Sequence, residues 1–132
     1  QHETQLFARA AALEDEAEAR YLAFEARESM RARQARWYVG ADAYLSEAED
    51  LWLTFEGAGQ WAAYRWLVDP RGGGSRPEDV LPRFTADRQW SQAEGFALVL
   101  LLDRLTQGAW KRHAFGDGAK TVLEMLDAAL EE

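Results

Sequence analysis

The chain has 132 residues, a formal net charge of −8 and no cysteine. This length suits one domain with its own hydrophobic core, while the negative charge argues against a general nucleic-acid-binding or anionic membrane-binding surface. The lack of cysteine excludes disulfides and thiolate metal sites, and no apolar run approaches the roughly 18–20 residues that a membrane-spanning helix needs.

Helix-forming residues dominate and no long segment alternates at a period of two, so the sequence predicts an all-α fold. We expect a bundle of about four main helices joined by short helical turns. The first two are predicted over residues 3–37 and 43–68. The third is predicted over residues 91–106, and its run 96–102 is apolar on every side, which indicates the central helix of the bundle. The last helix follows Gly118 and continues to the end of the chain.

These helices are expected to form one domain, residues 1–132. Residues 69–77 are the one obvious flexible loop, because they contain two prolines and three consecutive glycines. Such a loop serves as a connection, a hinge or a proteolysis site. Since the chain begins at Gln1 and not at methionine, we also expect it to be a trimmed or cleaved part of a longer protein.

The second predicted helix carries an apolar stripe with carboxylates at its edge. With Trp52 at 0° and about 100° per residue, Glu56 lies at about 40° and Glu49 at about 60°. We expect Glu56 to face inward among tryptophans, and both carboxylates to line one groove. Burying a carboxylate costs several kcal/mol unless a partner compensates it. The stripe consists of Tyr44, Ala48, Leu51, Trp52, Phe55, Gly59, Ala62 and Trp66.

Three interpretations of Glu56 follow from this position. It pairs with an arginine of the first helix, such as Arg27 or Arg31, it serves as a metal ligand or general base in a cleft, or it is exposed at the edge of the stripe. Glu94 has a simpler interpretation. Ser91 and Glu94 stand three residues apart before an apolar run, which is typical of a capping box.

The two histidines complete no catalytic or metal-binding motif. His2 and Glu3 begin like the zinc motif His-Glu-x-x-His, but Leu6 stands where the second histidine belongs. His113 is flanked by basic residues, and we interpret it as a surface residue or a satisfied core residue. No nucleophile–histidine pair and no phosphate-binding glycine loop can be assigned.

Three segments carry a family resemblance. Residues 13–36 hold the run Leu-Glu-x-Glu-Ala-x-Ala-x-Tyr followed by spaced arginines. Residues 49–57 end in Glu-Gly, and residues 95–111 contain Leu-Leu-Leu-Asp-Arg-Leu followed by Trp-Lys. In this order the segments resemble the C-terminal part of bacterial gluzincin-type metallopeptidases. Those proteins bind zinc through a His-Glu-x-x-His helix and through the glutamate of a later Glu-Gly-x-Ala-x-Tyr helix.

The resemblance implies that Glu56 is the third zinc ligand and that Trp61 or Tyr64 lines the substrate cleft. Zinc would then activate a water molecule for attack on a peptide carbonyl. This chain departs from the family pattern, with Gly59 in place of the alanine and Trp61 in place of the tyrosine. The two histidines and the catalytic glutamate are also absent, so zinc is expected only if histidines lie upstream.

Two main functions therefore compete. In the first, the chain is the C-terminal helical half of a zinc metallopeptidase-like protein, and it is not catalytically complete without an upstream peptidase segment. In the second, it is a metal-free binding or structural domain whose aromatic groove holds a peptide or protein partner, as its six tryptophans, six phenylalanines and four tyrosines suggest. A small-molecule pocket between helices is a third hypothesis. The expected cleft-lining residues are Glu49, Trp52, Trp61 and Tyr64.

Overall fold

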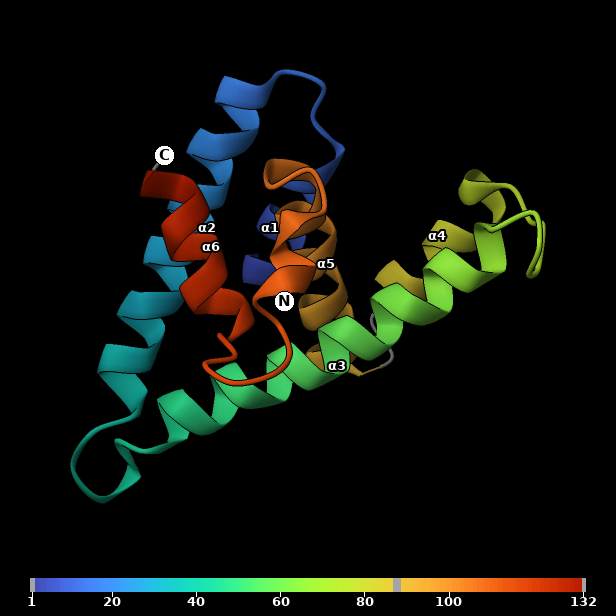
Figure 1. Cartoon of the computed structure of the whole chain (residues 1–132). Helices are drawn as coiled ribbons and strands as arrows, with labels where there is room; N and C mark the ends of the chain where they lie inside the picture. Colours follow the sequence, from blue (N-terminus) through green and yellow to red (C-terminus); the bar gives the residue numbers. More distant parts are fainter. Residues whose placement is uncertain (1, 87–88, 132) are drawn as a thin grey trace.

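The computed structural model describes residues 2–86 and 89–131, and these residues form helices and no strand (Figure 1). The predicted all-α bundle is confirmed. None of the helices in the described ranges is both long enough and apolar enough to cross a membrane. The elements are α1 (His2–Ala12), α2 (Glu16–Trp37), η1 (Gly40–Asp42), α3 (Leu45–Val68), α4 (Pro77–Thr85), α5 (Trp90–Leu105), η2 (Ala109–Arg112) and α6 (Val122–Glu131).

The single long helix predicted over residues 3–37 is wrong, because the chain breaks between α1 and α2. Asp15 has an extended backbone, with φ −70° and ψ 122°, and its side chain accepts a hydrogen bond of 2.7 Å from the backbone N–H of Glu18. This is an N-cap, which starts a new helix. The break allows α1 to fold back along α2 and to contact α5 as well.

Helix α5 is the centre of the bundle, as predicted. It packs against α1, α3, α4 and α6. Its side chains from Phe96 to Leu102 are buried or nearly so on every side of the helix. Around it lies a core formed mainly by Phe7, Ala23, Ala26, Met30, Leu53, Trp110, Leu123 and Leu126.

Helices α3 and α5 cross in backbone contact at two glycines. A Cβ atom built on Gly57 would lie 2.3 Å from the carbonyl oxygen of Gly95, and one built on Gly95 would lie 2.7 Å from the carbonyl oxygen of Leu53. Neither position has room for a side chain. The two Glu-Gly pairs of the sequence therefore bring their glycines together at one helix crossing.

The crossing turns the apolar stripe of α3 outward, so the expectation that the stripe faces inward is wrong. Trp52 is 53% exposed, Phe55 73% and Trp66 63%. The inward face instead carries the residues in line with Gly57, which are Glu49, Leu53 and Tyr64. The hydrophobic pattern alone predicted the wrong buried face of α3, because the close approach at Gly57 decides which side of this helix meets the core.

The segment between α3 and α4 folds back on the end of α3. The backbone N–H of Gly73 donates to the carbonyl of Trp66 at 3.0 Å, and that of Ser75 donates to the carbonyl of Leu67 at 2.9 Å. Helix α4 continues through Pro82, and its Phe84 packs edge-on against Tyr64 at 5.7 Å between ring centroids. The C-terminal half of α3 and α4 together extend to one side of the bundle (Figure 1).

The glycine crossing gives a matched pair of substitutions. Gly57→Ala should lower the free energy of unfolding by about 3 kcal/mol, because the added methyl collides with backbone that cannot move aside. Gly59→Ala, two residues further along the same helix, meets no atom within 4 Å and should raise it by about 1 kcal/mol through helix propensity. Urea unfolding of both variants at low protein concentration measures the difference. Equal effects of the two substitutions would contradict the crossing.

Candidate functional site

Arg33 of α2 joins buried carboxylates from two other helices. Its Nε atom donates to the two carboxylate oxygens of Glu3 at 3.1 and 3.0 Å. Its Nη1 atom donates to Glu49 Oε2 at 3.1 Å, and its Nη2 atom donates to Glu49 Oε1. Glu3 is 8% exposed and Glu49 6%, so each buried carboxylate has the charged partner that it needs. The hydrogen bonds that Arg33 donates to Glu49 raise the pKa of Arg33, and the guanidinium stays charged.

The arginines that the sequence suggested as partners of Glu56 bind elsewhere. Arg27 forms a bidentate pair with Asp127 of α6, at 2.8 and 3.0 Å. Arg31 contacts Glu28 and the same Asp127. Glu56 is partly exposed and has no hydrogen bond or ion pair from its side chain within residues 2–86 and 89–131. The predicted pairing of a carboxylate on the second predicted helix with an arginine of the first is thus found at Glu49, whose partner is Arg33.

Glu94 is the most buried carboxylate of the described chain, at 2% exposure. The predicted capping box is wrong, because Gln89 is the N-cap of α5 and no side chain caps this end. Instead Glu94 Oε2 accepts a hydrogen bond of 2.8 Å from the hydroxyl of Thr4 on α1. Glu94 Oε1 is buried and has no hydrogen-bond partner among residues 2–86 and 89–131. Burial raises the pKa of Glu94, and the hydrogen bond from Thr4 only partly offsets this.

These groups converge on a pocket of about 310 Å³, which we call the acidic pocket. Three carboxylates there face one guanidinium, so the pocket favours positive charge. Tyr38 lies at its edge and donates from its hydroxyl to Glu49 Oε2 at 2.5 Å, which raises the pKa of Tyr38. The lining consists of His2, Glu3, Arg33, Tyr38, Glu49, Trp90 and Glu94.

A second hollow of about 280 Å³ adjoins the acidic pocket and shares Tyr38, Glu49 and Trp90 with it. Leu45, Ala48 and Trp52 complete its wall, so it is the more apolar of the two. The acidic pocket and this apolar annexe form one groove between the ends of α2, α3 and α5.

The four expected cleft residues do not share one cleft. Glu49 and Trp52 line the groove just described. Trp61 packs edge-on against Trp110 with ring centroids 5.2 Å apart, and Tyr64 belongs to the aromatic cluster under α4. Neither Trp61 nor Tyr64 lines the acidic pocket or its annexe.

Sequence reasoning predicted Glu49 and Trp52 of this groove and missed its other residues, among them Glu3, Arg33, Tyr38 and Trp90. One signal could have found Arg33. Ala19, Ala23, Ala26 and Met30 are buried at helical spacing on α2, and the next position of that face is Arg33. An arginine at the end of a buried stripe indicates a buried acid opposite it. No comparable signal identifies which acid, because Glu3 and Glu49 lie 30 and 16 residues away along the chain.

Metal-ligating geometry is not found. In the described ranges no group of three or more histidine, aspartate or glutamate side chains is arranged to hold a metal ion. The guanidinium of Arg33 already binds both Glu3 and Glu49, and it supplies the positive charge that a cation would otherwise bring.

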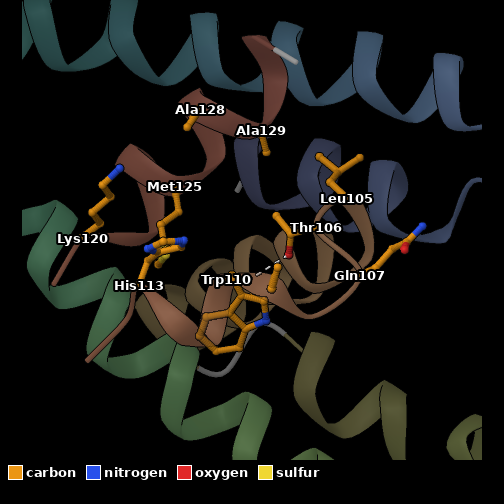
Figure 2. A pocket seen from close by; sticks show the side chains of 10 residues that line it. Leu105, Thr106, Gln107, Trp110, His113, Lys120, Met125, Ala128 and Ala129 are labelled. Atoms are coloured by element: carbon orange, nitrogen blue, oxygen red, sulfur yellow. Dashed lines mark hydrogen bonds between the residues drawn. The ribbon is translucent and has the colours of Figure 1, made fainter. Parts of the chain in front are cut away.

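A pocket of about 340 Å³ lies between α6 and the turn after α5 (Figure 2). Its wall combines apolar residues such as Leu105 and Met125 with the polar residues Thr106, Gln107, His113 and Lys120. The hydroxyl of Thr106 is already engaged, donating to the carbonyl of Leu102 and accepting from the N–H of Trp110. Within residues 2–86 and 89–131 this pocket is lined by no residue with a buried, unpartnered side-chain polar atom, whereas the acidic pocket is lined by Glu94, whose Oε1 atom is one. The acidic pocket is therefore the stronger candidate site.

Comparison with known proteins gives no assignment, since no family model, no curated protein and no solved structure matches this chain. The site is therefore interpreted from its own geometry.

The raised pKa of Glu94 makes stability depend on pH with a definite sign. Between its unfolded and its folded pKa the folded state binds the extra proton, so stability falls as pH rises through that window. Glu94→Gln removes the ionisation and keeps an oxygen for Thr4. The variant should therefore gain stability over the unmodified chain on going from pH 4 to pH 7, as measured by thermal unfolding. Glu25→Gln, at an exposed position of α2, is the control and should show no such gain.

Proposed function

We propose that this chain is a helical binding domain whose acidic pocket receives an ammonium or guanidinium group joined to an apolar body. The observation that carries the proposal is Glu94 Oε1, a buried carboxylate oxygen of a pocket-lining residue that has no partner in the described part of the chain. A buried polar atom left unpaired destabilises the fold, and a ligand that donates a hydrogen bond to it recovers that loss.

The charge of the pocket selects the sign of the ligand. Arg33 compensates Glu3 and Glu49 through hydrogen bonds to both, which leaves Glu94 as the pocket carboxylate without an ion pair among the described residues. An anionic ligand would meet three carboxylates. A positively charged donor would stabilise the ionised form of Glu94 and lower its raised pKa.

The walls of the groove select the rest of the ligand. Trp90 and Tyr38 lie at the junction between the acidic pocket and its annexe, where their rings can face a cation or an apolar chain. Leu45 and Trp52 continue the apolar surface beyond them. A lysine or arginine side chain or the N-terminal amine of a peptide combines these features. A small arylalkyl amine such as phenethylamine carries the same chemistry.

Binding can be tested with three probes of graded chemistry: phenethylamine, its neutral analogue phenethyl alcohol, and an acetylated, amidated Phe-Lys dipeptide. Phenethylamine should bind with a dissociation constant on the order of 1 mM, and the alcohol at least about tenfold more weakly. Tighter binding of the dipeptide would identify a peptide as the source of the amine. Chemical-shift changes of the tryptophan indole N–H groups and calorimetry measure the dissociation constants of all three probes.

Two carboxylate variants make the test specific. Glu94→Gln should remove the preference for the amine over the alcohol, because the compensating charge is gone. Glu56→Gln, which changes a carboxylate that lines neither hollow, should leave the preference intact. Equal binding of amine and alcohol to the unmodified chain would contradict the proposal.

A second proposal rests on the resemblance to the gluzincin-type metallopeptidases: that the chain is the C-terminal helical half of such a protein and that Glu56 is a zinc ligand. One observation supports it. Glu56 directly precedes the α3–α5 crossing and has no partner within residues 2–86 and 89–131, so its carboxylate is available to a ligand set supplied from outside these residues. The chemistry would require histidines that this sequence does not contain.

Metal analysis tests this second proposal. The longest natural form of the protein should contain about one zinc ion per chain, and Glu56→Gln should lower that content by at least about tenfold, because one of three protein ligands is lost. Glu47→Gln, which changes an exposed carboxylate on the opposite face of α3, is the matched control. A metal-free natural form, or equal zinc in both variants, would exclude Glu56 as a ligand.

A further inference from the structure

Helix α3 presents a seam of six residues that the described parts of the chain leave largely exposed. They follow one another at intervals of four, three, four, three and four residues, which is the spacing of one coiled-coil face. All six are exposed. In Figure 1, α3 runs along one edge of the molecule, and α5 and α6 pack against it from the other side. The seam residues are Ala48, Trp52, Phe55, Gly59, Ala62 and Trp66.

The order of large and small residues along this seam is complementary to itself. If a second α3 runs antiparallel, with the two-fold axis at position 57, each large side chain meets a small one. Trp66 faces Ala48 of the second copy, Trp52 faces Ala62, and Phe55 faces Gly59. We propose that two copies of this chain associate through antiparallel pairing of their α3 helices.

Gly59 supports this arrangement independently. Glycine disfavours the interior of a helix, so it requires a reason there. At Gly57 the reason is the crossing with α5, but a Cβ built on Gly59 meets no atom within 4 Å. The fold of one copy does not need this glycine. In the antiparallel pair it leaves the space that the phenyl ring of the second copy's Phe55 fills.

The seam is large enough for a small specific dimer interface. Nineteen residues of helix, from Ala48 to Trp66, span about 27 Å. The exposed parts of Trp52, Phe55 and Trp66, together with Leu51 beside them, amount to about 1,000 Å² over two copies. This reaches the range of a small specific interface, and the two-fold symmetry closes the assembly at two chains.

One feature opposes the association and makes the register testable. Glu56 flanks the seam next to the axis, so the carboxylates of the two copies approach each other there. Their like charges weaken the dimer. Replacing Glu56 with a neutral residue should therefore lower the dissociation constant of a dimer in this register. A partner of different sequence would not place a second Glu56 beside the first, so the same replacement would not relieve a repulsion there.

The experiment measures mass in solution by sedimentation equilibrium and by light scattering. The unmodified chain of 15.0 kDa should form a dimer with twice that mass at about 100 μM. Gly59→Phe should raise the dissociation constant at least about tenfold, because two large rings then collide across the seam. Combining it with Phe55→Ala exchanges the large and small partners and should restore the dimer. Ala32→Phe, at an exposed position of α2, is the control and should leave the dissociation constant unchanged.

Thermal unfolding keeps these variants interpretable, because Gly59→Phe has open space in one copy and should unfold at or above the temperature of the unmodified chain at low concentration. Glu56→Gln should lower the dissociation constant. Three outcomes would overturn the proposal. The unmodified chain stays monomeric at about 100 μM, the Gly59→Phe variant dimerises as before, or the double variant with Gly59→Phe and Phe55→Ala fails to restore the dimer. Phe55 and Gly59 line neither hollow of the groove, but Ala48 and Trp52 of the seam line the annexe. The masses are therefore measured without an amine ligand, so that a failure of the dimer is distinguished from a failure of ligand binding.

Discussion

The backbone contact between Gly57 and Gly95 is the constraint on which the arrangement of this molecule depends. Two helices can approach this closely only where neither carries a Cβ atom, and the approach fixes the rotation of α3 about its axis. That rotation brings Glu49 and Leu53 inward. It also leaves Trp52 and Phe55 in solvent. The buried acid and the exposed aromatic seam are thus two consequences of one contact.

The groove shows how differently three buried carboxylates can be accommodated. Glu3 and Glu49 share one guanidinium, and the planar fork of Arg33 satisfies both through paired hydrogen bonds. Glu94 accepts one hydrogen bond from the hydroxyl of Thr4 and has no charge partner among the described residues. The first arrangement ties α1, α2 and α3 together. The second leaves an unsatisfied group at a pocket wall, which is why we place the binding function there and not in the larger pocket near Trp110.

Much of the fold could be predicted from local pattern. The apolar run of α5 identified the central helix because a helix without a polar face can be stable only when it is covered on all sides. The break at Asp15 was missed, although aspartate is a common N-cap, because helix-forming residues continue on both sides of it. The site was predicted only in part: Glu49 and Trp52 line the groove, while Trp61 and Tyr64 pack in other clusters.

The sequence by itself determined that this protein is helical, which helix lies at its centre, and that carboxylates on the second predicted helix need partners. Those properties depend on residue type and on spacing within one helix. Only the tertiary structure decided which face of α3 is buried, which arginine meets Glu49, and that Glu94 ends beside Thr4 instead of capping its own helix. These outcomes depend on contacts between residues far apart in the chain, and helical periodicity carries no information about them.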